Sequence, residues 1–165
     1  MWTPGAIANL LANDSAGYQF FCRQVWNQQS HADLATREHI ALICKLGANS
    51  VDDLNQLVLL TKELVTANPQ SARIRNHLAG VLYRAGRYDE ALDQLKRNLE
   101  VRDSIFDQLW LTFVRAQLND VEEAETLLAK LKDSEYSCEN LELRVLLREA
   151  ETLVSRKRDE LDAET

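Results

Sequence analysis

Three histidines are the side chains in this sequence best suited to hold a metal ion or to exchange a proton near neutral pH. His31, His39 and His77 lie in three different predicted segments, and no cysteine or carboxylate accompanies them at metal-ligand spacing. We therefore expect histidines on the surface or in a groove, with ordinary titration. No metal site and no cofactor are predicted.

The residue patterns that usually carry catalysis are missing from the sequence. It has no phosphate-cradling glycine pattern, no zinc-binding helix motif, no Cys-x-x-Cys pair and no nucleophile-elbow motif. The catalytic motifs of protein kinases are missing as well, so this segment could not transfer a phosphoryl group. We predict that the chain is not an enzyme.

The cysteines and the hydropathy pattern indicate the cellular compartment of the chain. Cys22, Cys44 and Cys138 are odd in number, far apart in the sequence and without the spacing of metal ligands. They are interpreted as small buried hydrophobic residues in a reducing cytosol. No apolar run approaches the roughly 18 residues that cross a bilayer, and residues 1–12 lack a basic leader region. A cytoplasmic chain without membrane contact is predicted.

The charge distribution narrows the class of partner. The 165 residues carry a formal net charge of -7. Residues 1–100 hold 10 acidic and 10 basic side chains, whereas residues 101–165 hold 16 acidic and 9 basic ones. Nucleic-acid binding requires clustered lysine and arginine, which this acidic chain does not have. We exclude nucleic acid and leave a basic peptide as a possible ligand.

The breaks between apolar helical patterns divide the chain into hairpins. Only two prolines and five glycines occur, and the abundant leucine, alanine, glutamate and glutamine favour helix. Gly47, for example, is expected to end a helix in the left-handed conformation. We predict a single all-α domain over residues 1–165, built as a right-handed stack of about four antiparallel helical hairpins with a C-terminal capping helix. The expected hairpins cover residues 4–28, 33–67, 71–101 and 105–133, and the capping helix covers about 138–161.

An internal repeat supports this architecture. Residues 86–92 superpose on residues 119–125, so that Ala91 and Ala124 occupy the same position 33 residues apart. A period of this length is typical of stacked helical hairpins, in which each unit buries its apolar face against its neighbours.

The clearest repeat resembles the tetratricopeptide pattern. The resemblance is carried by Leu78, Ala79, Leu82, Tyr83, Gly86, Tyr88, Ala91, Leu95 and Leu99. It implies that the small side chains of Ala79 and Ala91 let two helices approach closely. It also implies that the chain binds another polypeptide. The sequence departs from the pattern at Arg75, where a large aromatic residue is expected, and at Asp103, where proline is expected.

A second resemblance covers residues 17–132. This stretch is similar to the C-terminal helical-repeat region of large bacterial regulatory proteins that begin with a serine/threonine kinase domain or a WD-repeat array. Residues 16–18, residues 82–91 and the leucine-rich helix that ends at residues 100–102 carry it. It implies that the chain is a domain of a longer bacterial protein.

The tetratricopeptide resemblance also implies a concave groove, lined by fixed positions of each first helix. One segment of this groove is polar and basic, and the other is apolar and aromatic. Arg73 and Arg84 are candidate bidentate partners for a carboxylate of a bound peptide, or else they simply face solvent. The projected positions are Arg73, Asn76, His77, Gly80, Tyr83 and Arg84 in one repeat, and Phe106, Leu109, Trp110, Phe113, Ala116 and Gln117 in the next.

The function predicted from these observations is a protein-interaction module that binds a peptide or a partner domain in the groove. Two alternatives remain open. One is a structural role, in which an exposed terminal hairpin packs on a second copy to form a homodimer or on a preceding domain. The other is a regulatory tail of a bacterial kinase. Trp26 and Trp110 are expected to pack between hairpins rather than to anchor a partner.

Overall fold

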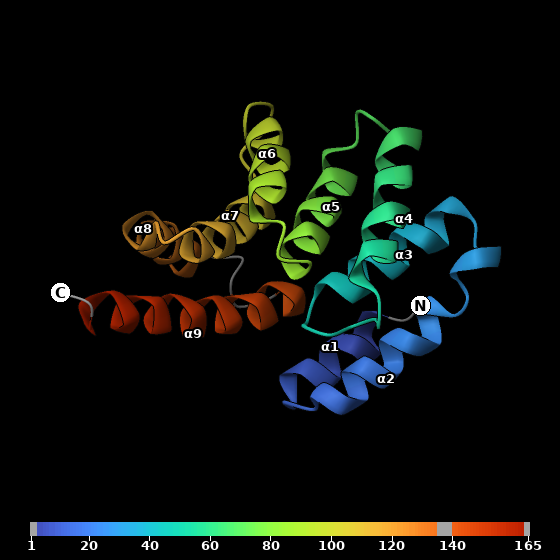
Figure 1. Cartoon of the computed structure of the whole chain (residues 1–165), viewed down its shortest axis with the longest axis horizontal. Coiled ribbons are helices and arrows are strands. Elements are labelled where there is room, and N and C mark those ends of the chain that lie inside the picture. Colours follow the sequence, from blue (N-terminus) through green and yellow to red (C-terminus); the bar gives the residue numbers. More distant parts are fainter. Residues whose placement is uncertain (1–2, 135–139, 164–165) are drawn as a thin grey trace. The chain divides into compact units, whose positions relative to one another are not determined.

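The computed structural model of the chain describes residues 3–134 and 140–163. Over these residues it contains nine α-helices and one 3-10 turn, without a strand, so the predicted all-α fold is confirmed (Figure 1). Cys138 and the predicted start of the capping helix lie outside the described residues. The elements are α1 (Thr3–Leu11), α2 (Ser15–Trp26), η1 (Gln29–His31), α3 (Leu34–Lys45), α4 (Leu54–Ala67), α5 (Ala72–Arg84), α6 (Tyr88–Leu99), α7 (Ile105–Gln117), α8 (Val121–Lys132) and α9 (Leu141–Ala163).

The chain forms two compact units, Met1–Arg87 with α1 to α5 and Tyr88–Thr165 with α6 to α9. In the first unit α3 packs against both α4 and α5, and α4 lies beside α5 (Figure 1). The apolar residues between these helices exclude water, which is the main stabilising contribution to such packing. They include Ala41, Leu60, Leu64 and Ile74, with Trp26 and Val65 packed at the edge of the cluster.

Polar side chains fix where the helices of the first unit begin. Asp33 Oδ1 accepts a hydrogen bond of 2.8 Å from the backbone N–H of Thr36 at the start of α3. Ser71 Oγ accepts one of 3.3 Å from the N–H of Ile74 at the start of α5, as the sequence predicts. Each bond satisfies a backbone donor that has no partner inside the helix.

Gly47 closes α3 in a different way from the one expected. Among the described glycines only Gly86 has a positive φ, so the predicted left-handed conformation of Gly47 is wrong. Its N–H instead donates to Tyr18 Oη at 2.8 Å, and Tyr18 Oη donates to the carbonyl of Ile43 at 2.9 Å. The buried hydroxyl of α2 thereby holds the C-terminal end of α3, and the Tyr18 ring lies directly over Gly47.

Substituting Gly47 tests this close approach. A Cβ at position 47 would lie 2.7 Å from Tyr18 Cε1 and 3.0 Å from Leu10 Cδ2. We expect Gly47→Ala to lower the free energy of unfolding by about 1 to 3 kcal/mol, the usual range for overpacking. Urea denaturation followed by circular dichroism measures the loss. If Gly47→Ala were as stable as the wild type, the packing of Tyr18 on Gly47 would be wrong.

The internal repeat is visible in the backbone of two turns. Gly86 has a φ of 72° and Asn119 a φ of 61°, and these two residues lie 33 positions apart. After Gly86, the N–H of Arg87 donates to the carbonyl of Leu82 at 2.9 Å. After Asn119, the N–H of Asp120 donates to the carbonyl of Arg115 at the same distance. Glycine and asparagine are the residues that adopt this left-handed helix-ending conformation most readily.

The second unit is centred on α7, which packs against α6, α8 and α9. Trp110 and Phe113 of α7 are fully buried, and their ring centroids lie 5.3 Å apart. Ala91 on α6 and Ala124 on α8 are also fully buried, so the two small residues of the repeat lie inside the unit. The expected core position of Trp110 is therefore confirmed.

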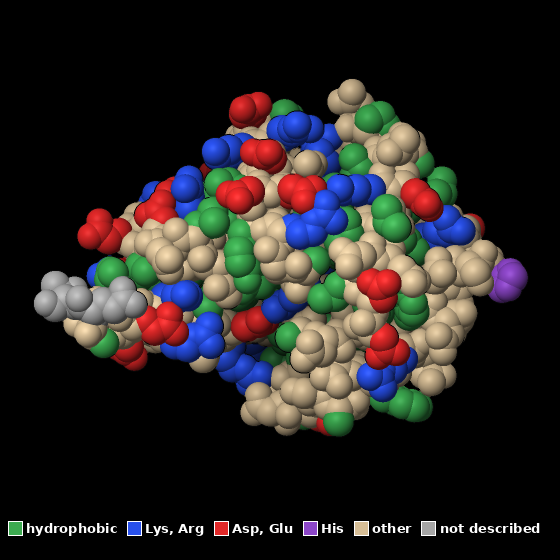
Figure 2. Space-filling model, in the orientation of Figure 1, with side chains coloured by type: hydrophobic (Ala, Val, Ile, Leu, Met, Phe, Trp, Pro, Cys, Tyr) green, Lys and Arg blue, Asp and Glu red, His purple; other side chains and the backbone are tan. Residues whose placement is uncertain are grey.

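Charged side chains of both signs are interspersed on the face that Figure 2 shows, with hydrophobic side chains scattered between them. Helix α9 has one buried apolar side and one exposed charged side. Leu146, Ala150 and Leu153 are buried, while Arg148 and Arg156 on the same helix are exposed. None of the helices in the described ranges is long and apolar enough to cross a membrane.

Candidate functional site

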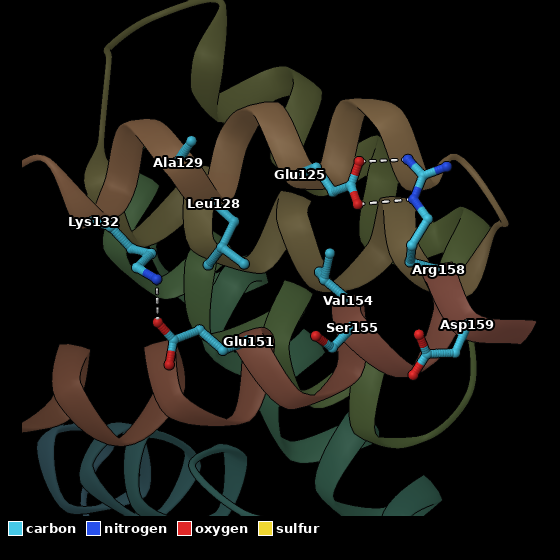
Figure 3. Close-up of a pocket in the computed structure, with 9 residues that line it drawn as sticks. All are labelled: Glu125, Leu128, Ala129, Lys132, Glu151, Val154, Ser155, Arg158 and Asp159. Atoms are coloured by element: carbon cyan, nitrogen blue, oxygen red, sulfur yellow. Dashed lines mark hydrogen bonds and ion pairs between the residues drawn. The ribbon is translucent and has the colours of Figure 1, made fainter. Parts of the chain in front are cut away.

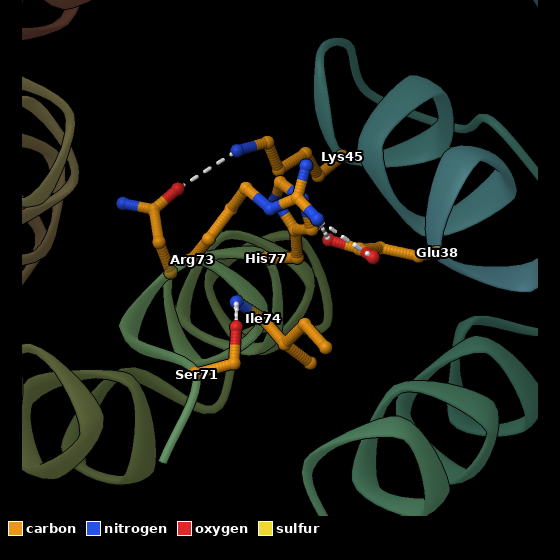
Figure 4. Close-up of polar contacts among 7 residues, drawn as sticks. Glu38, Lys45, Ser71, Arg73, Ile74 and His77 are labelled. Atoms are coloured by element: carbon orange, nitrogen blue, oxygen red, sulfur yellow. Dashed lines mark hydrogen bonds and ion pairs between the residues drawn. The ribbon is translucent and has the colours of Figure 1, made fainter. Parts of the chain in front are cut away.

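A cluster of polar and charged side chains occupies the contact between α3 and α5 in the first unit. Figure 4 shows Arg73 and His77 of α5 reaching toward Glu38 of α3, and Lys45 of α3 reaching back toward α5. The cluster is called the α3/α5 polar face below. Its members are Glu38, Lys45, Arg73, Asn76, His77 and Arg84.

Lys45 is the most unusual member, since its side chain is almost completely buried. Its ammonium Nζ donates a hydrogen bond of 2.9 Å to Asn76 Oδ1 on α5. A buried ammonium group is unfavourable unless polar atoms replace its water. Asn76, which is itself buried, supplies one of these atoms, so that α3 and α5 are joined by a buried polar contact.

Arg84 fixes the far end of the same interface. Its Nε donates to the carbonyl oxygen of Lys45 and its Nη2 to that of Leu46, both at 2.8 Å. These two carbonyls lie at the end of α3, where backbone acceptors lack partners inside the helix. Arg84 therefore acts as a C-terminal cap for α3, and the two donors that would grip a ligand carboxylate in a bidentate manner are engaged within the protein.

Arg73 differs from Arg84 in its exposure. Its side chain is 72% exposed and its Nη2 lies 2.9 Å from Glu38 Oε1, whereas the Glu38 side chain is only 16% exposed. An ion pair with one solvent-exposed partner contributes little to stability. Because arginine carries five N–H donors, Arg73 can bind a second carboxylate while it remains beside Glu38.

Burial governs the protonation of His77. Removal from water lowers the pKa of His77 to about 4, and the positive charge of Lys45 acts in the same direction. His77 is therefore neutral near pH 7. Its Nε2 lies 3.6 Å from Glu38 Oε1, and contact with the His77 ring is the main reason that the pKa of Glu38 is lowered, with Arg73 adding to the effect. His77 Nδ1 is buried without a hydrogen-bond partner among the described residues.

The structure places the predicted groove residues of α5 as follows. Asn76, His77, Gly80 and Tyr83 are buried, Arg84 is half-buried against α3, and Arg73 is exposed. Asn76, His77, Arg73 and Arg84 all contact α3. The sequence predicted that the histidines lie on the surface or in a groove, but His77 is buried.

The predicted groove residues of α7 belong to the second unit. Leu109, Trp110, Phe113 and Ala116 are fully buried and contribute to its core. The half-buried members are Phe106 and Gln117, at the two ends of the helix. These two residues are the parts of the predicted apolar segment that retain contact with solvent.

Two members of the α3/α5 polar face were not identified from the sequence. Glu38 and Lys45 lie seven residues apart on α3, and this spacing places them on the same face of a helix. That spacing was the available signal, but charged residues on a helix usually face solvent, so it did not by itself point to a site.

The described residues contain no group of three or more histidine, cysteine, aspartate or glutamate side chains that could hold a metal ion. Cys22 and Cys44 are free and buried. A hydrogen bond to Cys44 is the main cause that lowers the pKa of Cys22, so the two thiols are neighbours in the core of the first unit.

Comparison with protein-family models identifies one repeat. Residues 71–106 match the tetratricopeptide repeat. The matched tetratricopeptide repeat spans α5, α6 and the first residues of α7, so it includes the α5 residues of the α3/α5 polar face. The resemblance predicted from the sequence is confirmed for this segment, which covers about a fifth of the chain.

Other comparisons add no further assignment. No curated protein and no solved structure matches the chain. The predicted similarity to kinase-linked or WD-repeat-linked regulatory proteins therefore stays a prediction. The tetratricopeptide repeat supports a general role in protein–protein interaction and is typically not catalytic.

Proposed function

We propose that this chain is a protein-interaction module that binds an acidic segment of a partner polypeptide at the α3/α5 polar face, with Arg73 as the main contact. The observation that carries the proposal is local charge. The α3/α5 polar face holds three cationic side chains, Lys45, Arg73 and Arg84, and one carboxylate, Glu38, in a chain whose net charge is -7. A positive face on an acidic protein selects for a negatively charged ligand.

Each member of the face has a separate role in this proposal. Arg73 reaches solvent and presents its guanidinium to the ligand carboxylate. Lys45 and Arg84 are fixed inside the protein and contribute a positive potential without moving.

The half-buried Phe106 and Gln117 of α7 are proposed to contact the partner separately, through the apolar part of the predicted groove. Cytoplasmic localisation is proposed with this function. The partner itself is defined only by chemistry: a segment that carries aspartate, glutamate or a C-terminal carboxylate.

Selection from a library of random twelve-residue peptides tests the proposal. We expect the selected peptides to be enriched in acidic residues, and we expect Arg73→Glu to weaken their binding about tenfold or more. This estimate follows from the loss of a hydrogen bond between charged groups, about 1.5 to 3 kcal/mol. Fluorescence anisotropy of a labelled selected peptide gives the dissociation constants.

Arg97→Glu is the matched control, because Arg97 is an exposed arginine on α6 and the substitution makes the same change in net charge. It should leave the affinity unchanged. Equal binding to the wild type and to Arg73→Glu would contradict the proposal. If no peptide were selected and the chain eluted as a dimer in light-scattering chromatography, the structural role would replace it.

A further inference from the structure

The second unit carries a groove that has no part in the proposed function. It lies between α8 and α9, has a volume of about 500 Å³ and is open to solvent. Figure 3 shows the two helices running alongside one another, with Leu128 and Lys132 of α8 and Glu151 and Arg158 of α9 directed toward the space between them. The lining residues are Glu125, Leu128, Ala129, Lys132, Glu151, Val154, Ser155, Arg158 and Asp159.

The lining follows the same spacing on both helices. On α8 the lining residues are at positions 125, 128, 129 and 132. On α9 residues 151, 154, 155 and 158 have the same spacing, and residue 159 follows them. Residues with this spacing form one stripe along a helix. Two parallel stripes that face one groove are the surface into which a third helix packs.

The floor and the ends of the groove suit such a helix. Leu128 and Val154 supply apolar contact, while Ala129 and Ser155 are small and exposed and leave room for incoming side chains. At one end Arg158 makes a bidentate ion pair with Glu125, including a bond of 2.9 Å from Nε to Oε1. These contacts hold α8 and α9 at a fixed spacing at that end.

The other end is bridged as well. Lys132 Nζ lies 2.8 Å from Glu151 Oε1, so that ion pairs join the two helices at both ends of the apolar floor (Figure 3). The groove is therefore already formed in the free protein. Preformed sites bind more tightly because less conformational freedom is lost on association.

The charge of the groove distinguishes between possible occupants. Asp159 lines it and has no ion-pair partner among the described residues, whereas the other charged lining residues are paired with one another. Residues 101–165 also carry 16 acidic against 9 basic side chains. The unpaired charge and the net charge of residues 101–165 are both negative, so they favour a cationic ligand.

We propose that the α8/α9 groove binds an amphipathic helix of a partner protein. The helix places two or three apolar side chains, spaced three or four residues apart, over Leu128 and Val154. It directs a lysine or arginine at Asp159. This surface is separate from the α3/α5 polar face, and its ligand has the opposite charge.

A displayed library of 18-residue helical peptides, randomised along one face, is the probe for this site. We expect the selected helices to combine apolar residues at helical spacing with a lysine or arginine. Ala129→Trp fills the groove at an exposed position and should weaken binding of a selected helix at least tenfold. Thr126→Trp, an equally large change at an exposed position on the same helix, should leave the affinity unchanged.

Charge reversal tests the contact with Asp159. Asp159→Lys should favour a selected helix in which the basic residue has been replaced by glutamate over the original helix. Arg73→Glu should bind the original helix with wild-type affinity, so that the two proposed sites can fail independently. The proposal is overturned if no helix is selected, if Ala129→Trp binds as tightly as Thr126→Trp, or if the groove holds a second copy, shown by a dimer that Ala129→Trp alone dissociates.

Discussion

Trp110→Ala is expected to lower the free energy of unfolding of the second unit by about 3 to 5 kcal/mol, the range found when a large buried aromatic residue is truncated. Among the residues that the structure describes, Trp110 is the largest fully buried side chain, and it packs against Phe113 in the helix that contacts α6, α8 and α9. Removal of the indole would leave a cavity at the point where these helices meet. Urea denaturation monitored by circular dichroism at 222 nm measures the change.

Trp26→Ala provides the matched control for this experiment. Trp26 is half-buried and packs at the edge of the cluster around Leu60 and Leu64 in the first unit. The same chemical change should therefore cost less than at Trp110, because fewer contacts are lost and water can enter the space. If Trp26→Ala proved the more damaging variant, the position of Trp110 at the centre of the second unit would be wrong.

The stability of the first unit should fall by about 3 kcal/mol between pH 7 and pH 4 through His77 alone. Burial lowers the pKa of His77 in the folded chain to about 4, from an ordinary value of 6.5. The folded state therefore favours the neutral ring. The contribution of the neutral His77 ring to the free energy of unfolding is fully present above pH 6.5. As the pH falls through this window the unfolded chain binds a proton that the folded chain does not. A difference of 2.5 pKa units corresponds to roughly 3 kcal/mol.

Histidine substitutions separate this effect from that of the carboxylates, whose protonation also destabilises the protein in acid. His77→Gln removes the titrating ring. The fall in the free energy of unfolding between pH 7 and pH 4 should therefore be smaller than in the wild type by about 3 kcal/mol. His39→Gln makes the same chemical change at an exposed histidine of α3 and serves as the comparison variant. Identical pH profiles for His77→Gln and the wild type would show that His77 titrates normally in the folded chain.

Local features of the sequence were sufficient to predict the helices and the repeat. Ser71 caps α5 as expected, because a capping hydroxyl acts within a few residues of its own position. The turns at Gly86 and Asn119 repeat after 33 residues for the same reason: the left-handed conformation depends on the residue at that point and on the two helices beside it.

The candidate site was harder to predict, because its geometry depends on contacts between helices that are distant in the sequence. Lys45 is buried because α5 supplies Asn76 as a partner 31 residues later. Gly47 is required by the ring of Tyr18, which lies 29 residues earlier. The α8/α9 groove likewise depends on two helices separated by residues 133–140, and neither stripe alone indicates a site.

The close packing of α3 and α5 also determines which residues can test binding. Tyr83 is buried and Arg84 caps α3, so their removal would disturb the fold together with any ligand contact. Arg73 is exposed, and its single substitution changes the surface with little effect on the core. It is therefore the most informative position on the α3/α5 polar face.

Charge exchange at Arg73 is the most direct test of the central claim, that this face binds an acidic segment of a partner. The affinity of one selected acidic peptide, and of the same peptide with its acidic residue changed to lysine, would be measured by isothermal titration calorimetry on the wild type and on Arg73→Glu. The account predicts that the wild type prefers the acidic peptide and that Arg73→Glu prefers the lysine peptide. An unchanged preference in Arg73→Glu would contradict it, because the acidic segment would then bind elsewhere on the chain.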